Sequence, residues 1–384
     1  MGSMVKLTEH QTALGWPANR KPLKILSGSE VSRADLPFES APRVVRRLGL
    51  TVFEVSAWQA GHMRFVILGA GGIGGVIGGR LFQHGFDVVL IARGAHGAAI
   101  QANGLRIEDP DATVNLSVPT VITPAELHWK PDDVVVVATK SQDAEAALEA
   151  LVAVAPATIA VVCATNGVEV ERMGLRRFKN VYGLNVMMPT AYLEPGVVQI
   201  ICAPISGGLD VGRYPEGIDA VAQEIAAALS ASTFVSDPCE KIMRFKYRKL
   251  VLNMANAVEA ACGVDSDAAK MLIAGATAEA EAVYVAAGID VAAPEEDAAK
   301  RALMRYRPIN GQRRGGGSTW QSVVRGGSVE TAYLNGEIVL LGRIHNVPTP
   351  FNELLQTVMI EMKRDGTAPM SLRAETLLTR IPIK

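Results

Sequence analysis

A short apolar run, Arg64–Leu68 (RFVIL), leads directly into the glycine-rich segment Gly69–Gly74 (GAGGIG). A helical pattern over Ile73–His84 follows at once, and the next apolar run is Asp87–Ile91 (DVVLI). Near-continuous Val, Ile and Leu are typical of a strand that is buried on both faces of a parallel sheet. The order strand, tight turn, helix, strand therefore predicts a β-α-β unit with parallel strands.

The same alternation continues to about residue 236. Helices are predicted at Ala144–Val154 and Asn166–Phe178, and they lie between further strand-like runs. Those runs are Val134–Ala138, Ile159–Cys163, Val181–Met187, Val197–Cys202 and Ser206–Val211. We therefore expect residues 63–236 to form an α/β domain, a Rossmann-type doubly wound sheet.

From about Asp237 onward, helical patterns replace the strand-like runs. A loop rich in glycine is expected over residues 308–318, where PINGQRRGGGS contains the longest cluster of helix breakers. The predicted helices are Lys241–Cys262, Asp265–Ala287, Pro294–Tyr306, Thr319–His345 and Phe351–Arg364. We expect residues 237–384 to form an all-helical C-terminal domain.

Residues 1–62 have a different texture, with four prolines, scattered charge and no sustained helical or strand period. Their acidic residues do not fit a transit peptide, and no continuous apolar stretch follows a basic start as in a signal peptide. We expect either a poorly ordered extension or a non-native leader from an upstream translation start.

The composition excludes several classes of function. Among 384 residues, 38 basic and 39 acidic side chains leave a formal charge of −1, which does not fit a general nucleic-acid-binding protein. No apolar run reaches the ~18–20 residues that a membrane-spanning helix needs. The scattered Cys163, Cys202, Cys239 and Cys262 show neither metal-binding spacing nor a disulfide framework. We predict a cytoplasmic protein with no metal site and no nucleic-acid or membrane partner.

The segment Gly69–Gly74 matches the pattern G-x-G-x-x-G at the point where a strand passes into a helix. In such a segment the first glycine permits a tight turn, the second lets the backbone approach a pyrophosphate, and the third lets the helix pack on the strand. The free N–H groups at the start of the helix then favour phosphate. A structural turn in a cofactor-free sheet is the alternative. We predict a dinucleotide site made by Gly69, Ala70, Gly71, Gly72, Ile73 and Gly74.

The end of the second strand indicates which dinucleotide is bound. An NAD-dependent protein usually has an acidic residue there, which binds the ribose 2′-hydroxyl. This chain has Ile91-Ala92-Arg93-Gly94 instead, and the guanidinium of Arg93 can bind a 2′-phosphate through two hydrogen bonds. An exposed arginine without function is the alternative. The sequence favours NADP (NADPH) over NAD.

Five segments in a fixed order resemble the ketopantoate reductase (2-dehydropantoate 2-reductase) family over residues 63 to about 364. They are GAGGIG at 69–74 with Arg93 after the next strand, ATKSQ at 138–142, TNGV at 165–168, YRKLVLN at 247–253, and the segment from Ser318 to the ETAYLNG at 330–336. The resemblance implies an enzyme that reduces a 2-keto acid with NADPH, most specifically 2-dehydropantoate to pantoate in pantothenate biosynthesis.

The resemblance also implies roles for individual residues. Lys249 would be the catalytic lysine and Lys140 would face the adenosine phosphate. Asn166 would lie between cofactor and substrate. The substrate would be bound by Asn166, Asn253, Ser318 and Glu330.

Several of these roles agree with the chemistry of the residues. Ketone reduction needs a proton donor near the carbonyl oxygen, and no histidine lies in the matching segments. Lys249 can fill this role, and Asn253 shares its helix face four residues later. Ser318 and Gln321 form the pattern S-x-x-Q, which predicts a capping box at the start of a helix and a site for a carboxylate. The alternatives are that Lys249 is a surface lysine in a basic stretch and that Glu330 is a solvated helical residue, both without a role in the reaction.

The chain also departs from the family pattern. Ala257 stands where the family often has a second asparagine, with Asn256 one position early, and Ser322 replaces the usual aspartate. Arg313 and Arg314 add positive charge that could favour a more acidic substrate. Two alternatives therefore stay open, namely a reductase for another 2-keto or hydroxy acid and a non-catalytic NADPH-binding protein. Apolar helix faces from residue 265 onward could also pair two copies in a homodimer.

Overall fold

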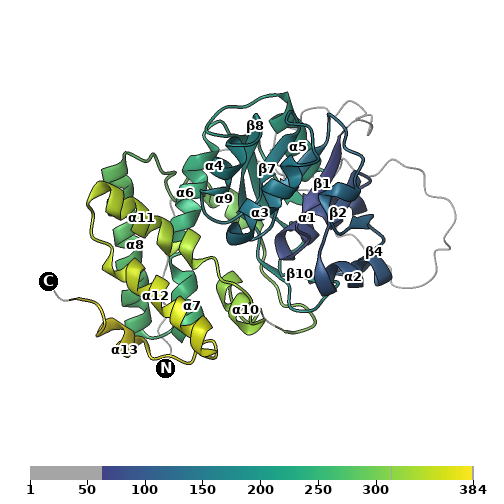
Figure 1. The fold of residues 1–384 in the computed structure, drawn as a ribbon. Coiled ribbons are helices and arrows are strands. Elements are labelled where there is room, and N and C mark those ends of the chain that lie inside the picture. Colours follow the sequence, from purple (N-terminus) through teal and green to yellow (C-terminus); the bar gives the residue numbers. More distant parts are fainter. Residues whose placement is uncertain (1–62, 313, 383–384) are drawn as a thin grey trace, which may run out of the picture. The chain divides into compact units, whose positions relative to one another are not determined.

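The computed structural model describes residues 63–312 and 314–382 (Figure 1). The expectation for residues 1–62 and the suggestion about Arg313 lie outside these described residues. The described part belongs to one compact unit, so the predicted domain boundary near residue 236 stays a prediction.

Eight strands form the main sheet, and all neighbouring pairs are parallel except β8 and β11. Their order is β12-β11-β8-β7-β6-β1-β2-β5. The register aligns Leu68 of β1 with Ile91 of β2 and with Val137 of β6, so the chain leaves these strands at one edge of the sheet. The strands are β1 (Arg64–Leu68), β2 (Asp87–Ile91), β5 (Thr120–Val121), β6 (Val134–Val137), β7 (Ala160–Cys163), β8 (Asn180–Met187), β11 (Gly207–Arg213) and β12 (Phe234–Val235).

Helices cover both faces of this sheet. On one face, α1 (Gly72–Gln83) and α5 (Ala220–Ser230) pack into a core with the side chains that strands β1, β2 and β11 direct to that side. On the other face, α3 (Ser141–Val152) and α4 (Val170–Leu175) pack against β1, β6 and β7. Apolar residues are buried on both sides of the strands, as the near-continuous Val, Ile and Leu runs predict. The α/β Rossmann-type doubly wound fold is confirmed.

A second sheet of four strands was missed by the sequence analysis except for β10. It has the order β4-β3-β10-β9 and packs on the side of α1 away from the main sheet. Helix α1 fits between the two sheets because it has glycines where it contacts them. A Cβ atom at Gly75 would lie only 2.9 Å from Val198 Cγ1, and one at Gly78 only 2.8 Å from Ile67 Cγ1. The strands are β3 (Leu105–Glu108), β4 (Thr113–Leu116), β9 (Thr190–Ala191) and β10 (Val197–Ile200), and α2 (Gly94–Asn103) follows β2.

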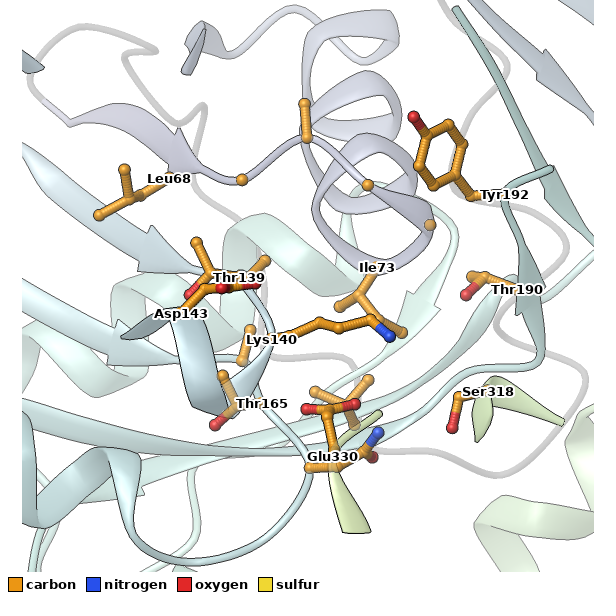
Figure 2. Close-up of a pocket in the computed structure, with 18 of the residues that line it drawn as sticks. Leu68, Ile73, Thr139, Lys140, Asp143, Thr165, Thr190, Tyr192, Ser318 and Glu330 are labelled. Carbon is orange, nitrogen blue, oxygen red and sulfur yellow. The ribbon is translucent and has the colours of Figure 1, made fainter. Parts of the chain in front are cut away.

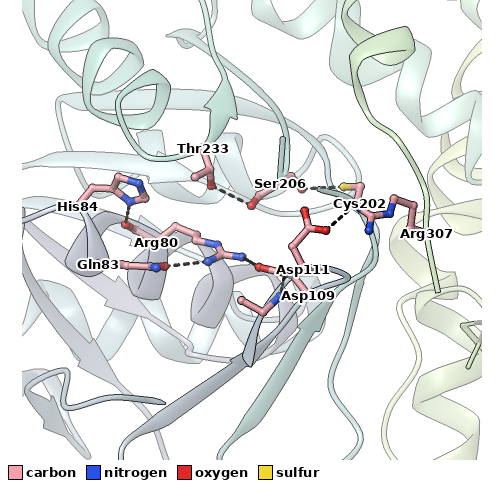
Figure 3. Close-up of polar contacts among 10 residues, drawn as sticks. Arg80, Gln83, His84, Asp109, Asp111, Cys202, Ser206, Thr233 and Arg307 are labelled. Atoms are coloured by element: carbon pink, nitrogen blue, oxygen red, sulfur yellow. Dashed lines mark hydrogen bonds and ion pairs between the residues drawn. The ribbon is translucent and has the colours of Figure 1, made fainter. Parts of the chain in front are cut away.

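A buried ion pair joins α1 to the turn between β3 and β4 (Figure 3). The guanidinium of Arg80 contacts the carboxylate of Asp109 and also donates to Gln83 Oε1 at 2.8 Å. The second oxygen of Asp109 accepts hydrogen bonds from the backbone N–H groups of Asp111 and Ala112, both at 2.7 Å. Because Arg80 is buried, its charge depends on Asp109 for compensation.

We expect Asp109→Asn to lower the free energy of unfolding by about 3 kcal/mol, because it leaves a buried guanidinium without a counter-charge. Asp111→Asn is the matched control, since the Asp111–Arg307 pair at 2.6 Å is about half exposed and should contribute less than about 1 kcal/mol. Denaturant unfolding of both variants measures the difference. Equal, small effects would show that the buried pair does not hold α1 in place.

All the secondary-structure elements named after β12 in the described part are helices, which confirms the predicted helical C-terminal region; a non-helical segment lies between α9 and α10. Its separate core is made mainly by α7, α8, α11 and α12, which lie together in Figure 1. The helices are α6 (Ile242–Leu252), α7 (Ala255–Cys262), α8 (Asp267–Ala287), α9 (Ala298–Leu303), α10 (Ser318–Val324), α11 (Asn335–His345), α12 (Pro350–Asp365) and α13 (Ala374–Leu378), with a 3-10 turn, η3, at Thr331–Tyr333. None of the helices in the described residues is long and apolar enough to cross a membrane.

Several predicted helices were too long. The helix expected over 241–262 is two helices, because the N–H of Asn253 bonds to both Lys249 O and Leu250 O and the chain then turns. The helix expected over 319–345 is broken after α10, where Gly326 adopts a positive φ of 64°. Three further helices are shorter than predicted. The prediction 294–306 corresponds to α9, 166–178 to α4, and 265–287 to α8.

The predicted capping box at Ser318 was wrong. Gly317 caps α10, and Ser318 is the first residue of the helix with no side-chain cap bond. Gln321 instead reaches across to the second sheet, where its amide donates to Thr190 O at 3.1 Å and accepts from Tyr192 N at 3.2 Å. The same amide nitrogen also donates to Gly316 O at 3.2 Å, so Gln321 joins the start of α10 to the second sheet.

Candidate active site

A cavity of about 790 Å³ opens at the carboxyl ends of β1, β2, β6 and β7, between the sheet and the segments around α6 and α10 (Figure 2). All the predicted site residues line it except Gly74. The lining includes Gly69, Ala70, Gly71, Gly72, Ile73, Arg93, Lys140, Asn166, Lys249, Asn253, Ser318 and Glu330. Folding therefore brings five separate parts of the sequence to one place.

The glycine turn has the geometry that the pattern requires. Gly69 has φ +101°, and an added Cβ atom would lie 2.9 Å from Thr139 N, so a larger residue does not fit. Gly74 does not line the cavity but lets the helix pack closely on the sheet. A Cβ atom there would lie 2.9 Å from both Ala138 Cβ and Ile67 Cγ2. Helix α1 begins at Gly72, so its first N–H groups have no partner within the helix and are available to an anion.

His96 supports this turn and was missed by the sequence analysis. Its Nδ1 accepts a hydrogen bond from Gly196 N at 2.8 Å, and its Nε2 lies 2.7 Å from Ala70 O. Burial lowers the pKa of His96, so the ring is neutral and Nε2 carries the hydrogen that it donates to Ala70. The ring of Tyr192 lies 4.4 Å from the His96 ring and borders Gly71. The sequence signal that could have identified His96 is its position three residues after Arg93, close to the predicted cofactor site.

The two cations predicted to bind adenosine phosphate lie in different surroundings. Arg93 is exposed at the start of α2 and forms no ion pair among the described residues. Lys140, at the start of α3, donates to Ser322 Oγ and to Ser328 O at 2.8 Å, so it ties the sheet to α10 and the loop after it. Figure 2 shows the Lys140 side chain among the residues that line the cavity.

Lys249 lies on α6 with its ammonium against the ends of two strands. Its Nζ atom donates to Asn166 Oδ1 at 2.9 Å and to Val186 O, which uses two of its three hydrogens. The pKa of Lys249 is lowered to about 7, mainly by burial; the nearby charges of Lys246 and Arg314 act in the same direction, and the attraction of Glu330 opposes them. A lysine with a pKa near neutrality can both donate and accept a proton.

A buried ion pair lies one helical turn before Lys249. Lys246 Nζ is 2.5 Å from Glu171 Oε1, and both side chains are almost fully buried. The same ammonium donates to Thr165 O at 3.0 Å and to Cys163 O and Leu184 O at 3.4 Å. Lys246 thus fastens the backbone that leads into Asn166. The sequence analysis assigned no role to Lys246, because its burial leaves no signal in the local sequence.

Glu330 and Asn253 complete the wall of the cavity. Glu330 Oε1 accepts hydrogen bonds from the N–H and the hydroxyl of Ser141, both at 3.0 Å, so the loop after α10 is held against the start of α3. The Nδ2 atom of Asn253 is buried and has no hydrogen-bond partner among the described residues. Asn256 also lines the cavity, whereas Ala257 points into the helical core. Although the asparagine that the family often has at position 257 is missing, the neighbouring Asn256 places an amide at the cavity from the first turn of α7.

The arrangement can transfer a proton to an oxygen atom in a cavity that the glycine turn also lines. A carbonyl oxygen beside Lys249 would meet the third hydrogen of its ammonium, with amide groups on either side. No group of three His, Cys, Asp or Glu side chains that could bind a metal occurs within residues 63–312 and 314–382.

Comparisons with known proteins agree with this geometry. Residues 65–215 match the family described as ketopantoate reductase PanE/ApbA, and residues 241–363 match its C-terminal part. The 2-dehydropantoate 2-reductase of Pyrococcus horikoshii is 28% identical over 298 residues, which cover 76% of this chain and 95% of the relative. That of Halobacterium salinarum is 26% identical over 317 residues, which cover 79% and 100%.

Solved structures show the same fold. A PanE/ApbA family ketopantoate reductase from Ralstonia eutropha JMP134 has a TM-score of 0.67 and 26% identity, covering 79% of this chain and 99% of that protein. A D-mandelate dehydrogenase solved with NADH and anilino(oxo)acetate has a TM-score of 0.68 and 23% identity, covering 80% and 100%. The chain therefore belongs to the ketopantoate reductase family and is an oxidoreductase.

Proposed function

We propose that this chain reduces a 2-keto acid with NADPH, most specifically 2-dehydropantoate to pantoate, a step of pantothenate biosynthesis. The single observation that supports this most is the ammonium of Lys249 inside the cavity that the glycine turn also lines. The relatives named 2-dehydropantoate 2-reductase support the choice of substrate.

The residues present fit a dinucleotide. A Cβ atom at Gly71 would have no neighbour closer than 4.0 Å, so the turn has an open side, and the free N–H groups at the start of α1 lie next to it. Residues Gly69 to Ile73 would bind the pyrophosphate, and Arg93 the 2′-phosphate. When bound, the reduced nicotinamide supplies the hydride for the carbonyl carbon.

Lys249 would act as the general acid, giving one proton from Nζ to the carbonyl oxygen as negative charge develops there. Asn166 Oδ1 and the carbonyl of Val186 hold the ammonium in place, so its third hydrogen has a fixed direction. The unpaired amide of Asn253 would donate to the substrate, and Ser318 and Glu330 would border it.

We expect the rate of keto-acid reduction to fall with rising pH. The proton donor must be the ammonium form, and the pKa of Lys249 is about 7, so activity should decline about tenfold per pH unit above that value. Oxidation of the hydroxy acid, which needs the neutral amine, should change in the opposite direction. Profiles of kcat/KM from pH 5.5 to 9 in both directions measure this, and flat profiles would contradict the assignment.

We expect Arg93→Gln to raise KM for NADPH by about 10–100-fold, since hydrogen bonds from a charged group are worth about 1.5–3 kcal/mol. KM for NADH, which has no 2′-phosphate, should change less than about threefold. Arg176→Gln is a matched control, because Arg176 is exposed, pairs with Glu169 and lies away from the cavity. Equal losses for both cofactors would argue against NADP preference.

NADPH consumption by the full chain with a series of 2-keto acids tests the function directly. Turnover of 2-dehydropantoate above other keto acids supports the proposal. Preference for another 2-keto or hydroxy acid would support the second candidate, which Ala257, Ser322 and Arg314 motivate. NADPH binding with no turnover of any keto acid would indicate a non-catalytic protein.

The homodimer also stays a prediction. Exposed apolar side chains on α8 and α11, among them Val285 and Ile344, are compatible with a second copy. Sedimentation of the full chain measures the oligomeric state.

A further inference from the structure

Five cations and two carboxylates line the cavity, so it carries an excess of positive charge. The acids are Asp143 and Glu330, and the cations are Arg93, Lys140, Lys249, Arg314 and Arg325. Lys140 is held by serine oxygens and Lys249 by Asn166 and Val186. The three arginines form no ion pair with any described residue, which leaves them available to anionic ligands.

Arg314 and Arg325 lie at different parts of this cavity. The guanidinium of Arg325 is 4.6 Å from the centre of the Tyr192 ring, which borders Gly71 and Gly72 of the phosphate-binding turn. Arg314 lies three residues before Gly317, whose N–H donates to Glu259 Oε2 on α7 at 2.9 Å. It lines the cavity together with Lys249 at the end of α6, and its charge acts on that ammonium. Arg325 therefore belongs to the cofactor end and Arg314 to the end with the proton donor.

Arg314 forms no hydrogen bond or ion pair through its side chain with residues 63–312 or 314–382. Its Nε atom is buried and makes no hydrogen bond with any described residue. The carboxylate of Glu259 attracts it, but that carboxylate already accepts a hydrogen bond from Gly317 N at 2.9 Å and forms no ion pair with Arg314. A buried donor of this kind destabilises the folded protein unless something pairs with it. A ligand carboxylate would satisfy it through two parallel hydrogen bonds.

We propose that Arg314 binds the carboxylate of the substrate and thereby selects 2-keto acids with a single carboxylate next to the carbonyl; this inference rests on the proposed function of the cavity. In such a substrate the two groups are adjacent, so Lys249 and Arg314 can each bind one of them. A second carboxylate would have no cation of its own at this end, since Arg325 and Arg93 lie beside the cofactor turn. A neutral ketone would leave Arg314 unpaired.

The test compares 2-dehydropantoate with its neutral methyl ester on the full chain. We expect the unmodified enzyme to prefer the acid by at least about 100-fold in kcat/KM. Arg314→Gln should lower kcat/KM for the acid by about 100-fold, mainly through KM, and change that of the ester less than about threefold. Arg314→Lys should recover part of the preference, because it keeps the charge and loses the planar fork.

Two control variants separate the sites. Arg325→Gln should raise KM for NADPH and leave the preference for acid over ester unchanged. Arg307→Gln should change neither, since Arg307 pairs with Asp111 and does not line the cavity. An Arg314→Gln enzyme that keeps the full preference for the acid would overturn this inference. No turnover of any keto acid by the unmodified chain would instead overturn the proposed function.

Discussion

Lys249→Ala should lower kcat for keto-acid reduction by about a thousandfold while NADPH still binds. The variant removes the only described ammonium that combines a cavity position, a pKa near 7 and a hydrogen to spare for a carbonyl oxygen. General acid catalysis contributes about 10²–10⁴-fold, and loss of one donor to a developing oxyanion costs about 10²–10³-fold. Stopped-flow measurement of NADPH oxidation under single-turnover conditions isolates this step.

Lys241→Ala provides the matched control for this prediction. Lys241 is an exposed lysine at the start of the same helix, α6, and does not line the cavity. We expect it to retain kcat within about twofold. A Lys249→Ala enzyme with unchanged kcat on every accepted keto acid would remove Lys249 from the reaction.

Lys246→Met should produce the second large effect, a loss of at least about 3 kcal/mol in the free energy of unfolding. The change leaves the carboxyl of Glu171 buried without a counter-charge, which typically costs 3–5 kcal/mol. It also releases Thr165 O, so Asn166 should move and kcat should fall. Denaturant unfolding and steady-state kinetics of the same sample measure both effects.

The pH dependence of this loss has a definite sign. Burial raises the pKa of Glu171 above its value in the unfolded chain, so the carboxyl is tolerated when protonated and costs stability when ionised. The destabilisation by Lys246→Met should therefore be larger at pH 8 than at pH 5. The double variant Lys246→Met/Glu171→Leu should recover much of the stability, because no buried charge is left. A double variant as unstable as the single one would show that the ion pair is not the cause.

The central strands were predictable because strands that are buried on both faces consist almost entirely of apolar residues. The bounds of β1 and β2 agree with the predicted runs residue for residue, since a buried parallel strand needs apolar side chains at every position. The second sheet was not predictable in this way. Residues 106–108 pair with residues 197–199, far away in the sequence, and the partly exposed four-residue strand β4 carries no apolar run.

Helix ends were less predictable than helix positions. The apolar pattern continues across Asn253 and across Gly326, so periodicity alone predicts one helix where there are two. Both breaks matter for the site. The first lets Asn253 and Asn256 face the same cavity, and the second lets Glu330 reach Ser141.

A local sequence pattern can identify residues that are required for their backbone conformation or for the space beside their backbone. Gly69 needs a positive φ, and Gly74 needs space beside the strand, so both are visible in one short segment. His96 escaped notice because its two partners, Ala70 and Gly196, are far from it in the sequence. Ser318 was assigned a cap that the structure gives to Gly317.

The order of residue types along the chain determined the α/β class, the helical C-terminal region and the position of the glycine turn, because strands and glycine turns are local features. The tertiary structure alone decided the surroundings, and so the charge state, of each cation. Lys246 and Lys249 are three residues apart, yet one is neutralised by Glu171 and the other has a pKa of about 7. That difference arises from burial and from charges on distant segments, and no local pattern contains either quantity.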